Sequence, residues 1–234
     1  MEASITAILL MAGIGSRLGS SLPKQFHRLG QQKIYQHTLQ TFLESRLFEQ
    51  IILVCHPDWV DEVKKEVPPE VQVVPGGPTR QASSLLGLQA CNPGAEFVMV
   101  HDAVRPFVSP EILQRNISSV LKHRAVDTCI PSADTIVHSE EGTFITSIPD
   151  RKAYLRGQTP QTFDYQLIWE AHQKTRQVHA TDDCSLVLEL GHPVAVVLGE
   201  ESNIKITTEF DVELAEGILQ KNENLRRRSP LPCS

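Results

Sequence analysis

The sequence predicts an α/β fold, in which one mostly parallel, Rossmann-like sheet carries helices on both faces and an inserted β-arm. Short apolar runs rich in β-branched residues alternate with segments of helical periodicity, which is the pattern of strands joined by helical crossovers. A glycine-containing loop directly follows the first apolar run, at the strand end where open α/β sheets bind their ligands. A polar stretch over residues 132–155 interrupts the alternation, which indicates an insertion.

Six apolar runs are predicted to be buried strands, because each is short and bounded by residues that break regular structure. In chain order they are Ile5–Met11, Ile51–Cys55, Val71–Val74, Phe97–Val100, Cys129–Pro131 and Val194–Leu198. The helices that alternate with them imply a parallel sheet covered on both faces.

Helical periodicity recurs between these runs. The predicted helices are Ile34–Leu43, Trp59–Glu66, Arg80–Ala90, Ile112–Leu121, Leu167–Ala171, Cys184–Leu190 and Val212–Leu219. Ser109 followed by Pro110 predicts the start of the fourth helix, with the serine as N-cap and the proline in the first turn. Thr208 and Asp211 form a capping box for the last one.

The polar stretch 132–155 is rich in Thr and Ser and contains Gly142. It predicts a β-hairpin or arm inserted into the α/β domain, with a long surface loop as the alternative. The domain is expected to span residues 1–221. The tail 222–234, which contains Arg226, Arg227 and Arg228 followed by two prolines, is predicted to be disordered.

Composition narrows the class of protein. The 234 residues include 22 Lys and Arg against 28 Asp and Glu, a formal net charge of −6. A net anion is not attracted to nucleic acid or to anionic membranes, so neither is expected as a partner. No apolar run is long enough to span a membrane. The five cysteines are scattered without a C-x-x-C pair, which predicts reduced thiols and a cytoplasmic location.

The loop after the first strand contains Gly13, Gly15 and Arg17, and Lys24 follows it. Glycines allow backbone N–H groups to converge on an anion, and two flanking cations suit a triphosphate. The loop is not a dinucleotide fingerprint, because Leu18 occupies the third glycine position, and it is not a Walker loop. Taken alone, the glycines are equally consistent with a tight structural turn.

The loop and its surroundings resemble the cytidylyltransferase type of nucleotidyltransferase, and the resemblance continues through six motifs in the same order. These are Gly13-Ile14-Gly15-Ser16-Arg17 with Pro23-Lys24-Gln25, Gly76-Gly77-Pro78-Thr79-Arg80-Gln81-Ala82-Ser83, His101-Asp102-Ala103-Val104-Arg105-Pro106, Thr159-Pro160-Gln161, Thr181-Asp182-Asp183 and Asn203-Ile204-Lys205-Ile206-Thr207. They are most similar to the 2-C-methyl-D-erythritol 4-phosphate cytidylyltransferases. Ribitol-5-phosphate cytidylyltransferases are near relatives that share most of these motifs.

The resemblance implies a role for particular residues. The catalytic set would be Arg17, Lys24 and Lys205. The residues implied in nucleotide binding are Ala12, Gly13, Gly15, Gly77, Ser83, Asp102 and Ala103. Those implied in binding the second substrate, a polyol phosphate, are Arg105, Thr135, Arg151, Thr159 and Thr181. The chain departs from the family pattern at Pro78, often an acidic position, so no side-chain role is carried over there.

Several of these residues also have structural interpretations. Adjacent His101 and Asp102 could ligate a metal in a phosphohydrolase, but no further His or Asp has the spacing of a ligand set. Asp102 is therefore expected near the ribose or near a metal-bound water. Ser83 could be a helix serine that bonds its own backbone, and Lys24 and Lys205 could be solvated surface lysines.

The reaction implied is transfer of the cytidylyl group of CTP to 2-C-methyl-D-erythritol 4-phosphate, with release of diphosphate. The attacking group would be a phosphate oxygen that is already mostly ionised at neutral pH, so no general base is required. Local cations and Mg²⁺ would neutralise the repulsion between the two anions.

The residues leave three rival functions open. The first is the same transfer to ribitol 5-phosphate or to a different polyol phosphate. The second is a sugar-phosphate nucleotidyltransferase that prefers UTP or GTP. The third, from a different class, is a nucleotide-binding regulatory module without catalysis.

The arm 132–155 also predicts assembly. A hairpin that leaves a compact domain has strand edges it cannot satisfy alone, and pairing with a second copy around a two-fold axis would satisfy them. The resemblance adds that the arm reaches the neighbouring active site, so that Thr135 and Arg151 would act in trans within a homodimer.

Overall fold

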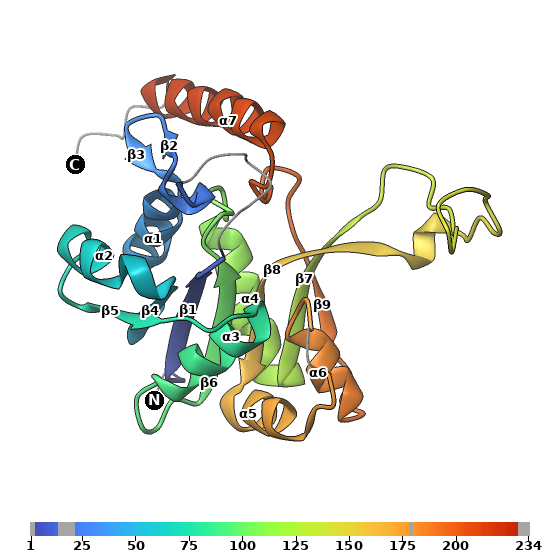
Figure 1. Ribbon diagram of the computed structural model, residues 1–234, viewed down its shortest axis with the longest axis horizontal. Helices are drawn as coiled ribbons and strands as arrows, with labels where there is room; N and C mark the ends of the chain where they lie inside the picture. The colour runs from blue at the N-terminus through green and yellow to red at the C-terminus, as the bar shows by residue number, and fades with distance from the viewer. Residues whose placement is uncertain (1–2, 14–21, 178–179, 229–234) are drawn as a thin grey trace.

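The computed structural model describes residues 3–13, 22–177 and 180–228. Its main sheet has the strand order β5-β4-β1-β6-β8-β7-β9 (Figure 1). The strands are β1 (Ile5–Met11), β4 (Gln50–Cys55), β5 (Val71–Pro75), β6 (Phe97–Asp102), β7 (Ala125–Pro131), β8 (Leu155–Asp164) and β9 (Ala195–Leu198). All neighbouring pairs are parallel except those of β8, which runs antiparallel to β6 and β7. The predicted fold class is confirmed.

Both faces of the sheet are covered by helices, as the alternating pattern predicts. One face is packed by α1 (Ile34–Ser45), α2 (Val60–Glu66) and α4 (Pro110–His123). The other is packed by α3 (Arg80–Gln89), α5 (Tyr165–Lys174) and α6 (Cys184–Glu189). Strand β1 divides the core: Ala7 and Leu9 face the first group, whereas Ile8 and Leu10 face the second.

The predicted helix starts have the expected caps. Ser109 Oγ accepts from the Ile112 N–H at 3.3 Å, and Pro110 opens α4. In the capping box of α7 (Glu209–Arg228), Thr208 Oγ1 accepts from Asp211 N–H at 3.3 Å and the Asp211 carboxylate accepts from Thr208 N–H at 2.8 Å. A small hairpin of β2 (Arg28–Leu29) and β3 (Gln32–Lys33) packs against α7. The helix continues through Arg228, so the disorder expected from Asn222 is wrong for residues 222–228, and residues 229–234 lie outside the described ranges.

The sequence pattern did not predict strand β8. It also predicted only Cys129–Pro131 of β7, which begins at Ala125. The β8 sequence LRGQTPQTFD has little apolar periodicity, and Pro160 argues against a central strand. The strand is nevertheless central because its buried polar side chains find partners. Thr162 Oγ1 donates to Asn116 Oδ1 at 3.1 Å, and Gln161 Nε2 donates to Asp127 Oδ1 at 3.1 Å.

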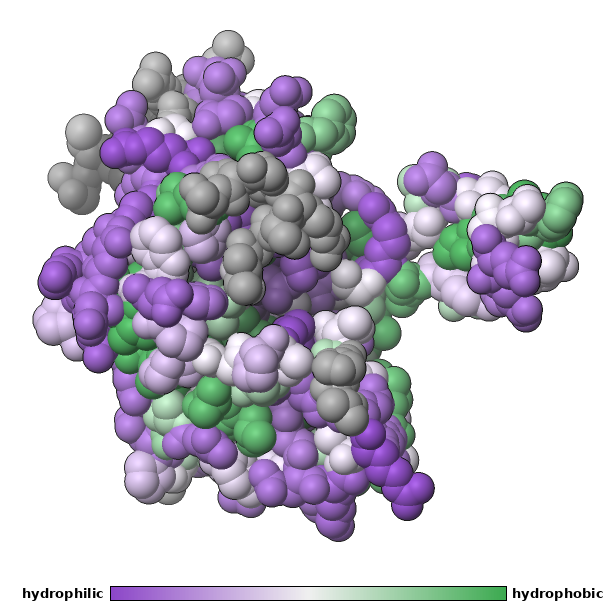
Figure 2. Space-filling view, in the orientation of Figure 1, coloured by the Kyte–Doolittle hydropathy of each residue, from purple (hydrophilic) through white to green (hydrophobic). Residues whose placement is uncertain are grey.

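Residues 132–154 leave the domain between β7 and β8 as a projecting arm (Figure 1). An antiparallel bridge joins His138 to Ser147 near its end. Apolar side chains lie exposed on it, among them Phe144 at 79% and Ile148 at 63% exposure, and Figure 2 shows apolar surface on the arm. The inserted arm is therefore confirmed. Among the described residues, no helix is both long and apolar enough to cross a membrane.

Candidate active site

A cavity of about 490 Å³ opens at the carboxyl ends of β1 and β6, beside the first turn of α3. Seven residues predicted from the sequence line it: Ala12, Gly13, Lys24, Gly77, Ser83, Asp102 and Lys205. They come from five separate segments, so the fold has brought together residues that are as many as 193 positions apart, from Ala12 to Lys205. Arg17 and Gly15 lie outside the described residues.

Gln25 explains why the Pro-Lys-Gln segment closes the glycine loop. Its buried amide donates from Nε2 to the Met11 carbonyl at 2.6 Å and to the Gly13 carbonyl at 3.0 Å. The two bonds fasten the segment to the end of β1. The neighbouring residue, Lys24, is thereby held at the wall of the cavity.

The loop before α3 forms the opposite wall, and its glycines are required by close packing. A Cβ at Gly76 would clash with Ala12 of the first loop, and one at Gly77 would lie 2.6 Å from Ala82 Cβ. Ser83 Oγ accepts from Gly77 N–H at 3.1 Å and donates to the Thr79 carbonyl at 2.9 Å. Ser83 therefore shapes this loop as well as lining the cavity, which supports part of its structural interpretation.

Asp102, at the end of β6, is the centre of a charged cluster. Lys205 Nζ lies 2.8 Å from Asp102 Oδ2, Arg105 Nε lies 3.8 Å from the same oxygen, and Arg80 Nε lies 3.7 Å from Oδ1. Burial alone would raise the pKa of the Asp102 carboxyl, but these three cations hold that pKa well below its usual range. Asp102 is therefore a permanent anion that gathers cationic side chains.

The segment that carries Lys205 is fixed by Asn203, the first residue of its motif. Asn203 is buried, and its Nδ2 donates to the Thr159 carbonyl at 2.9 Å. Its own carbonyl accepts from Arg105 Nη1 at 2.8 Å. Ile206 N–H donates to the Val104 carbonyl at 2.9 Å. With the backbone tied on both sides, Lys205 is held against Asp102 and is not a free surface lysine.

A second cavity, of about 410 Å³, adjoins the first. The two share Arg80, Asp102 and Lys205 as lining residues. The second cavity is also lined by Arg105, Thr159 and Thr181, three of the five residues implied for the second substrate. Two cavities that meet at a cationic cluster fit a reaction between two anionic substrates.

Thr159 and His101 form a hydrogen-bonded pair next to the backbone of Asp102. Thr159 Oγ1 accepts from Asp102 N–H at 3.0 Å and lies 3.0 Å from His101 Nδ1. His101 is fully buried against Phe42, with ring centroids 5.3 Å apart, so it is not a ligand of either cavity. No cluster of His, Cys, Asp or Glu that could hold a metal occurs within the ranges that the structure describes.

Arg80 is a site residue to which the motifs alone gave no separate role. Its Nη1 donates to Asp183 Oδ2 at 2.7 Å, and Asp183 Oδ1 lies 3.0 Å from His172 Nε2. Asp183 is fully buried and joins α3, α5 and α6. The signal was present in the motifs that contain Arg80 and Asp183, but the pairing of residues 103 positions apart depends on the fold.

We expect acid to destabilise the protein through these buried groups. Burial lowers the pKa of His101 to about 3, against ~6.5 in an unfolded chain. Burial alone would raise the pKa of Asp183, but Arg80 and His172 hold it at about 2, against ~3.9 unfolded. Both groups bind fewer protons when folded, so their stabilisation is complete above the unfolded pKa and is lost as the pH falls.

For His101 alone, the free energy of unfolding should fall by about 2 kcal/mol between about pH 7 and pH 5. Urea unfolding at the two pH values measures the loss, and Asp183 adds its share below about pH 4. His101→Gln should flatten the slope, because it removes the buried imidazole whose pKa differs between the folded and unfolded chain. A wild-type stability that is constant across this range would contradict the expectation.

Three predicted residues do not line either cavity. Ala103 is buried beneath them: its N–H donates to the Leu10 carbonyl at 3.0 Å and its carbonyl accepts from Thr38 Oγ1 at 2.8 Å. Thr135 and Arg151 lie on the arm, and Arg151 Nη1 donates to the Ala133 carbonyl at 2.6 Å. Neither arm residue reaches the cavities of its own chain.

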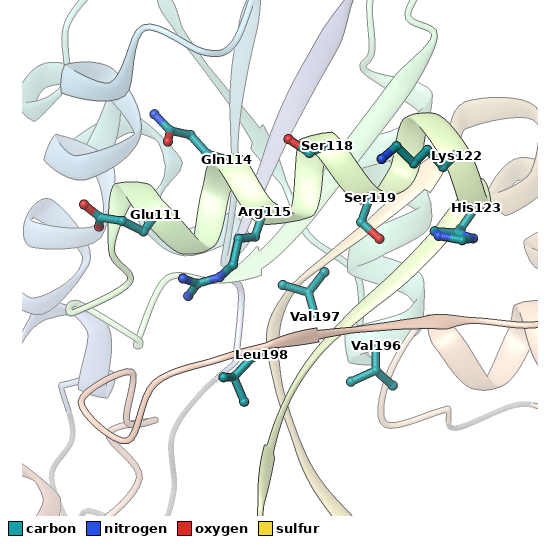
Figure 3. Close-up of a pocket in the computed structure, with 10 residues that line it drawn as sticks. All are labelled: Glu111, Gln114, Arg115, Ser118, Ser119, Lys122, His123, Val196, Val197 and Leu198. Carbon is teal, nitrogen blue, oxygen red and sulfur yellow. The ribbon is translucent and has the colours of Figure 1, made fainter.

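A groove of about 680 Å³ lies elsewhere, between α4 and the edge strand β9 (Figure 3). Figure 3 shows Arg115 pointing from α4 towards the strand, beside Val197 and Leu198. None of the residues predicted for function lines this groove. It has no charged cluster of the kind that surrounds Asp102, so the candidate active site is the pair of cavities that meets at Asp102.

The match to a known family decides what kind of site this is. Residues 5–221 match the family model of 2-C-methyl-D-erythritol 4-phosphate cytidylyltransferase, IspD. The chain belongs to the IspD family. It is accordingly a cytidylyltransferase, and the motif-based resemblance is confirmed.

Named members and relatives of the IspD family differ in their acceptor. The chain is 38% identical to ribitol-5-phosphate cytidylyltransferase of Lactiplantibacillus plantarum over 232 residues, covering 93% of this chain and 99% of the relative. It is 37% identical to the enzyme of that name from Streptococcus pneumoniae serotype 19F, covering 93% and 100%. A solved structure of 4-diphosphocytidyl-2C-methyl-D-erythritol synthase from Anaerococcus prevotii aligns with a TM-score of 0.82 at 33% identity, covering 93% and 99%.

Proposed function

We propose that this cytidylyltransferase transfers the cytidylyl group of CTP to the phosphate of ribitol 5-phosphate, forming CDP-ribitol and releasing diphosphate. The observation that carries the proposal is the full-length similarity, at 37–38% identity, to two enzymes named for that acceptor. Methylerythritol phosphate, which the motifs favoured, becomes the second candidate. The solved structure at 33% identity supports it, because that protein is named for the methylerythritol product.

CTP would occupy the cavity of the two glycine-containing loops, and the acceptor would occupy the adjoining cavity. The acceptor phosphate would then meet the α-phosphate of CTP at the shared residues Arg80, Asp102 and Lys205. An oxygen of the acceptor phosphate attacks the α-phosphorus, and the bond from that phosphorus to diphosphate breaks. Because the attacking phosphate is already ionised, the chain needs no general base.

The protein contributes positive charge to the reaction, and it holds the charged side chains in position. Lys205 lies at the junction of the two cavities, where charge shifts from the attacking to the leaving oxygens, and Lys24 lies on the nucleotide side. Two buried nitrogens of the cluster, Arg80 Nη2 and Arg105 Nε, have no hydrogen-bond partner among the described residues. Substrate phosphate oxygens would satisfy them. Asp102 is a positioning residue that holds these cations in place.

We also infer that Mg²⁺ takes part. Among the described residues that line the nucleotide cavity, Asp102 is the carboxylate, and three cationic side chains already surround it. These residues fit an ion that is held mainly by the phosphate oxygens of CTP, with Asp102 nearby. When bound, Mg²⁺ would neutralise part of the triphosphate charge.

The arm suggests that the enzyme works as a homodimer. Phe144, Ile145 and Ile148 are 79%, 61% and 63% exposed in the single chain, which is an unfavourable surface for a monomer. Thr135 and Arg151 are exposed on the same arm, which projects from the domain (Figure 1), and neither lines a cavity of its own chain. A second subunit would cover the apolar residues and receive the two polar ones at its acceptor cavity.

Diphosphate release tests the proposed function directly. With CTP and Mg²⁺, we expect turnover of ribitol 5-phosphate at least about tenfold above that of methylerythritol phosphate, the selectivity of one or two hydrogen bonds. UTP or ATP in place of CTP, and EDTA in place of Mg²⁺, should each abolish most of the signal. Higher turnover of methylerythritol phosphate would establish the second candidate instead.

A further inference from the structure

Asp127 on β7 is a cavity residue for which neither the family motifs nor the proposed mechanism has a use. It lines the acceptor cavity but not the nucleotide cavity. Its Oδ1 accepts from Gln161 Nε2 at 3.1 Å, and its Oδ2 accepts from Cys129 Sγ at 3.4 Å. A carboxylate offers about four acceptor positions, so part of its capacity is unused.

The partners of Asp127 differ in kind from those of the other buried acids. Asp102 lies within 4 Å of three cationic side chains, and Asp183 forms an ion pair with Arg80. Asp127 forms no ion pair with a Lys or Arg of the described ranges, and the side chains that donate to it are the amide of Gln161 and the thiol of Cys129. Burial accordingly raises the pKa of Asp127 above its usual value. A partly buried carboxylate without a cation is costly, and donors from a ligand would offset that cost.

The strand pairing keeps one side of this carboxylate accessible. Between Asp127 and Cys129 the register of β7 with β8 shifts: Asp127 pairs with Gln161, and Cys129 pairs with Gly157. A Cβ at Gly157 would lie 3.6 Å from Asp127 Oδ2, in van der Waals contact. Glycine at this position therefore leaves space beside the carboxylate, within the acceptor cavity that both residues line.

The acceptor cavity is electrically polarised. Its three cations, Arg80, Arg105 and Lys205, gather around Asp102, where the two cavities meet. Asp127 and Asp182 line the acceptor cavity alone. A polyol phosphate is drawn with its phosphate towards the junction and is repelled from the two carboxylates. Its hydroxyl-bearing end is thereby directed towards Asp127.

We propose that Asp127 determines acceptor specificity, because its carboxylate accepts hydrogen bonds from polyol hydroxyls at the end remote from the phosphate. The inference rests on the proposed function. Adjacent hydroxyls can donate to the two oxygens of one carboxylate, and hydrogen bonds to a charged acceptor are the stronger kind. Ribitol 5-phosphate has a longer chain and one more hydroxyl than methylerythritol phosphate. Asp127 therefore favours the longer, fully hydroxylated acceptor.

Asp127→Asn tests the inference with phosphorylated polyols of two lengths. Ribitol 5-phosphate is the acceptor, and the shorter glycerol 3-phosphate is a competing inhibitor. The variant should lower kcat/KM for ribitol 5-phosphate about 10- to 100-fold, the effect of losing hydrogen bonds to a charged group. The inhibition constant of glycerol 3-phosphate, measured against ribitol 5-phosphate, should change less than about threefold, because this shorter chain is not expected to contact Asp127. The KM for CTP should also stay within about threefold.

Asp164→Asn is the matched control. Asp164 caps α5 by accepting from Leu167 N–H at 2.9 Å, asparagine also caps helices, and the residue lines neither cavity. This variant should keep the wild-type preference. Asp127→Glu, which restores the charge, should recover part of the loss.

If kcat/KM for ribitol 5-phosphate and the affinity for glycerol 3-phosphate fall by the same factor, Asp127 has a merely structural role and the inference is overturned. An unchanged kcat/KM for ribitol 5-phosphate would also overturn it. If Asp127→Asn fails to fold in a thermal unfolding assay, Gly157→Ala decides, because its methyl group narrows the space beside the intact carboxylate. It should lower kcat/KM for ribitol 5-phosphate more than it weakens glycerol 3-phosphate. The proposed function is judged separately, by whether the wild-type enzyme uses ribitol 5-phosphate at all.

Discussion

Lys205→Ala is expected to lower kcat by about 10²–10³-fold, the range for removing one preorganised contact to a developing charge. Lys205 is the cation that borders both cavities and lies 2.8 Å from Asp102. The KM for CTP should rise much less, because in the proposed arrangement Gly13, Lys24 and Gly77 would still contact the nucleotide. Steady-state diphosphate release, with CTP and acceptor varied in turn, separates the two effects.

The matched control is Lys174→Ala. Lys174 is an exposed lysine paired with Glu170 one helical turn away, and it lines neither cavity, so its loss should leave kcat unchanged. Lys24→Ala should lower kcat by a factor similar to that of Lys205→Ala. A Lys205→Ala enzyme with near-normal kcat would mean that the Asp102–Lys205 pair serves only to hold the fold.

The sequence predicted those parts of the fold that depend on local pattern. Strand β1 is apolar except at Thr6 because both of its faces are buried, and the cap at Ser109 is a short-range hydrogen bond. Strand β8 was missed because its buried side chains are polar. Thr162 is satisfied by Asn116, 46 positions away, and no periodicity in the strand reports that partner.

The candidate site follows the same division. Motifs predicted Lys24, Ser83 and Lys205, and the structure brings all three to one cavity. Their sequence order could not reveal that Asp102 collects Arg80, Arg105 and Lys205, because that cluster exists only where β6, α3 and the segment after β9 meet. The acceptor was beyond motif reasoning because the sequence motifs resemble those of both acceptor classes.

Mixing inactive Lys24→Ala and Arg151→Ala subunits is expected to restore about a quarter of wild-type activity. Lys24 lies at the nucleotide cavity of its own chain. Arg151 is on the arm and lines neither cavity of its own chain, so we expect it to serve the cavity of a second subunit. Each mixed dimer would then contain one site without either lesion and one site with both.

If the two variants re-associate at random in equal amounts, about half of the dimers are mixed and about half of their sites are intact. Recovery should appear only after subunits exchange, by co-expression or by dilution and refolding. Two controls define the baseline: each variant mixed with itself, and Lys24→Ala mixed with Lys205→Ala. Both lysines line the same cavity of one chain, and exchange would leave every site of that second mixture with a lesion.

The result separates two roles for Arg151. Its Nη1 donates to the Ala133 carbonyl at 2.6 Å, so the side chain could serve only to shape the arm of its own chain. In that case a confirmed mixed dimer stays as inactive as its parents. A monomeric mass for the wild-type enzyme in light scattering would reject the exchange mechanism earlier, because it would leave Phe144 and Ile148 exposed without a partner. Recovery near a quarter requires that the arm complete the neighbouring acceptor cavity, where Arg151 would add a further cation to Arg80, Arg105 and Lys205.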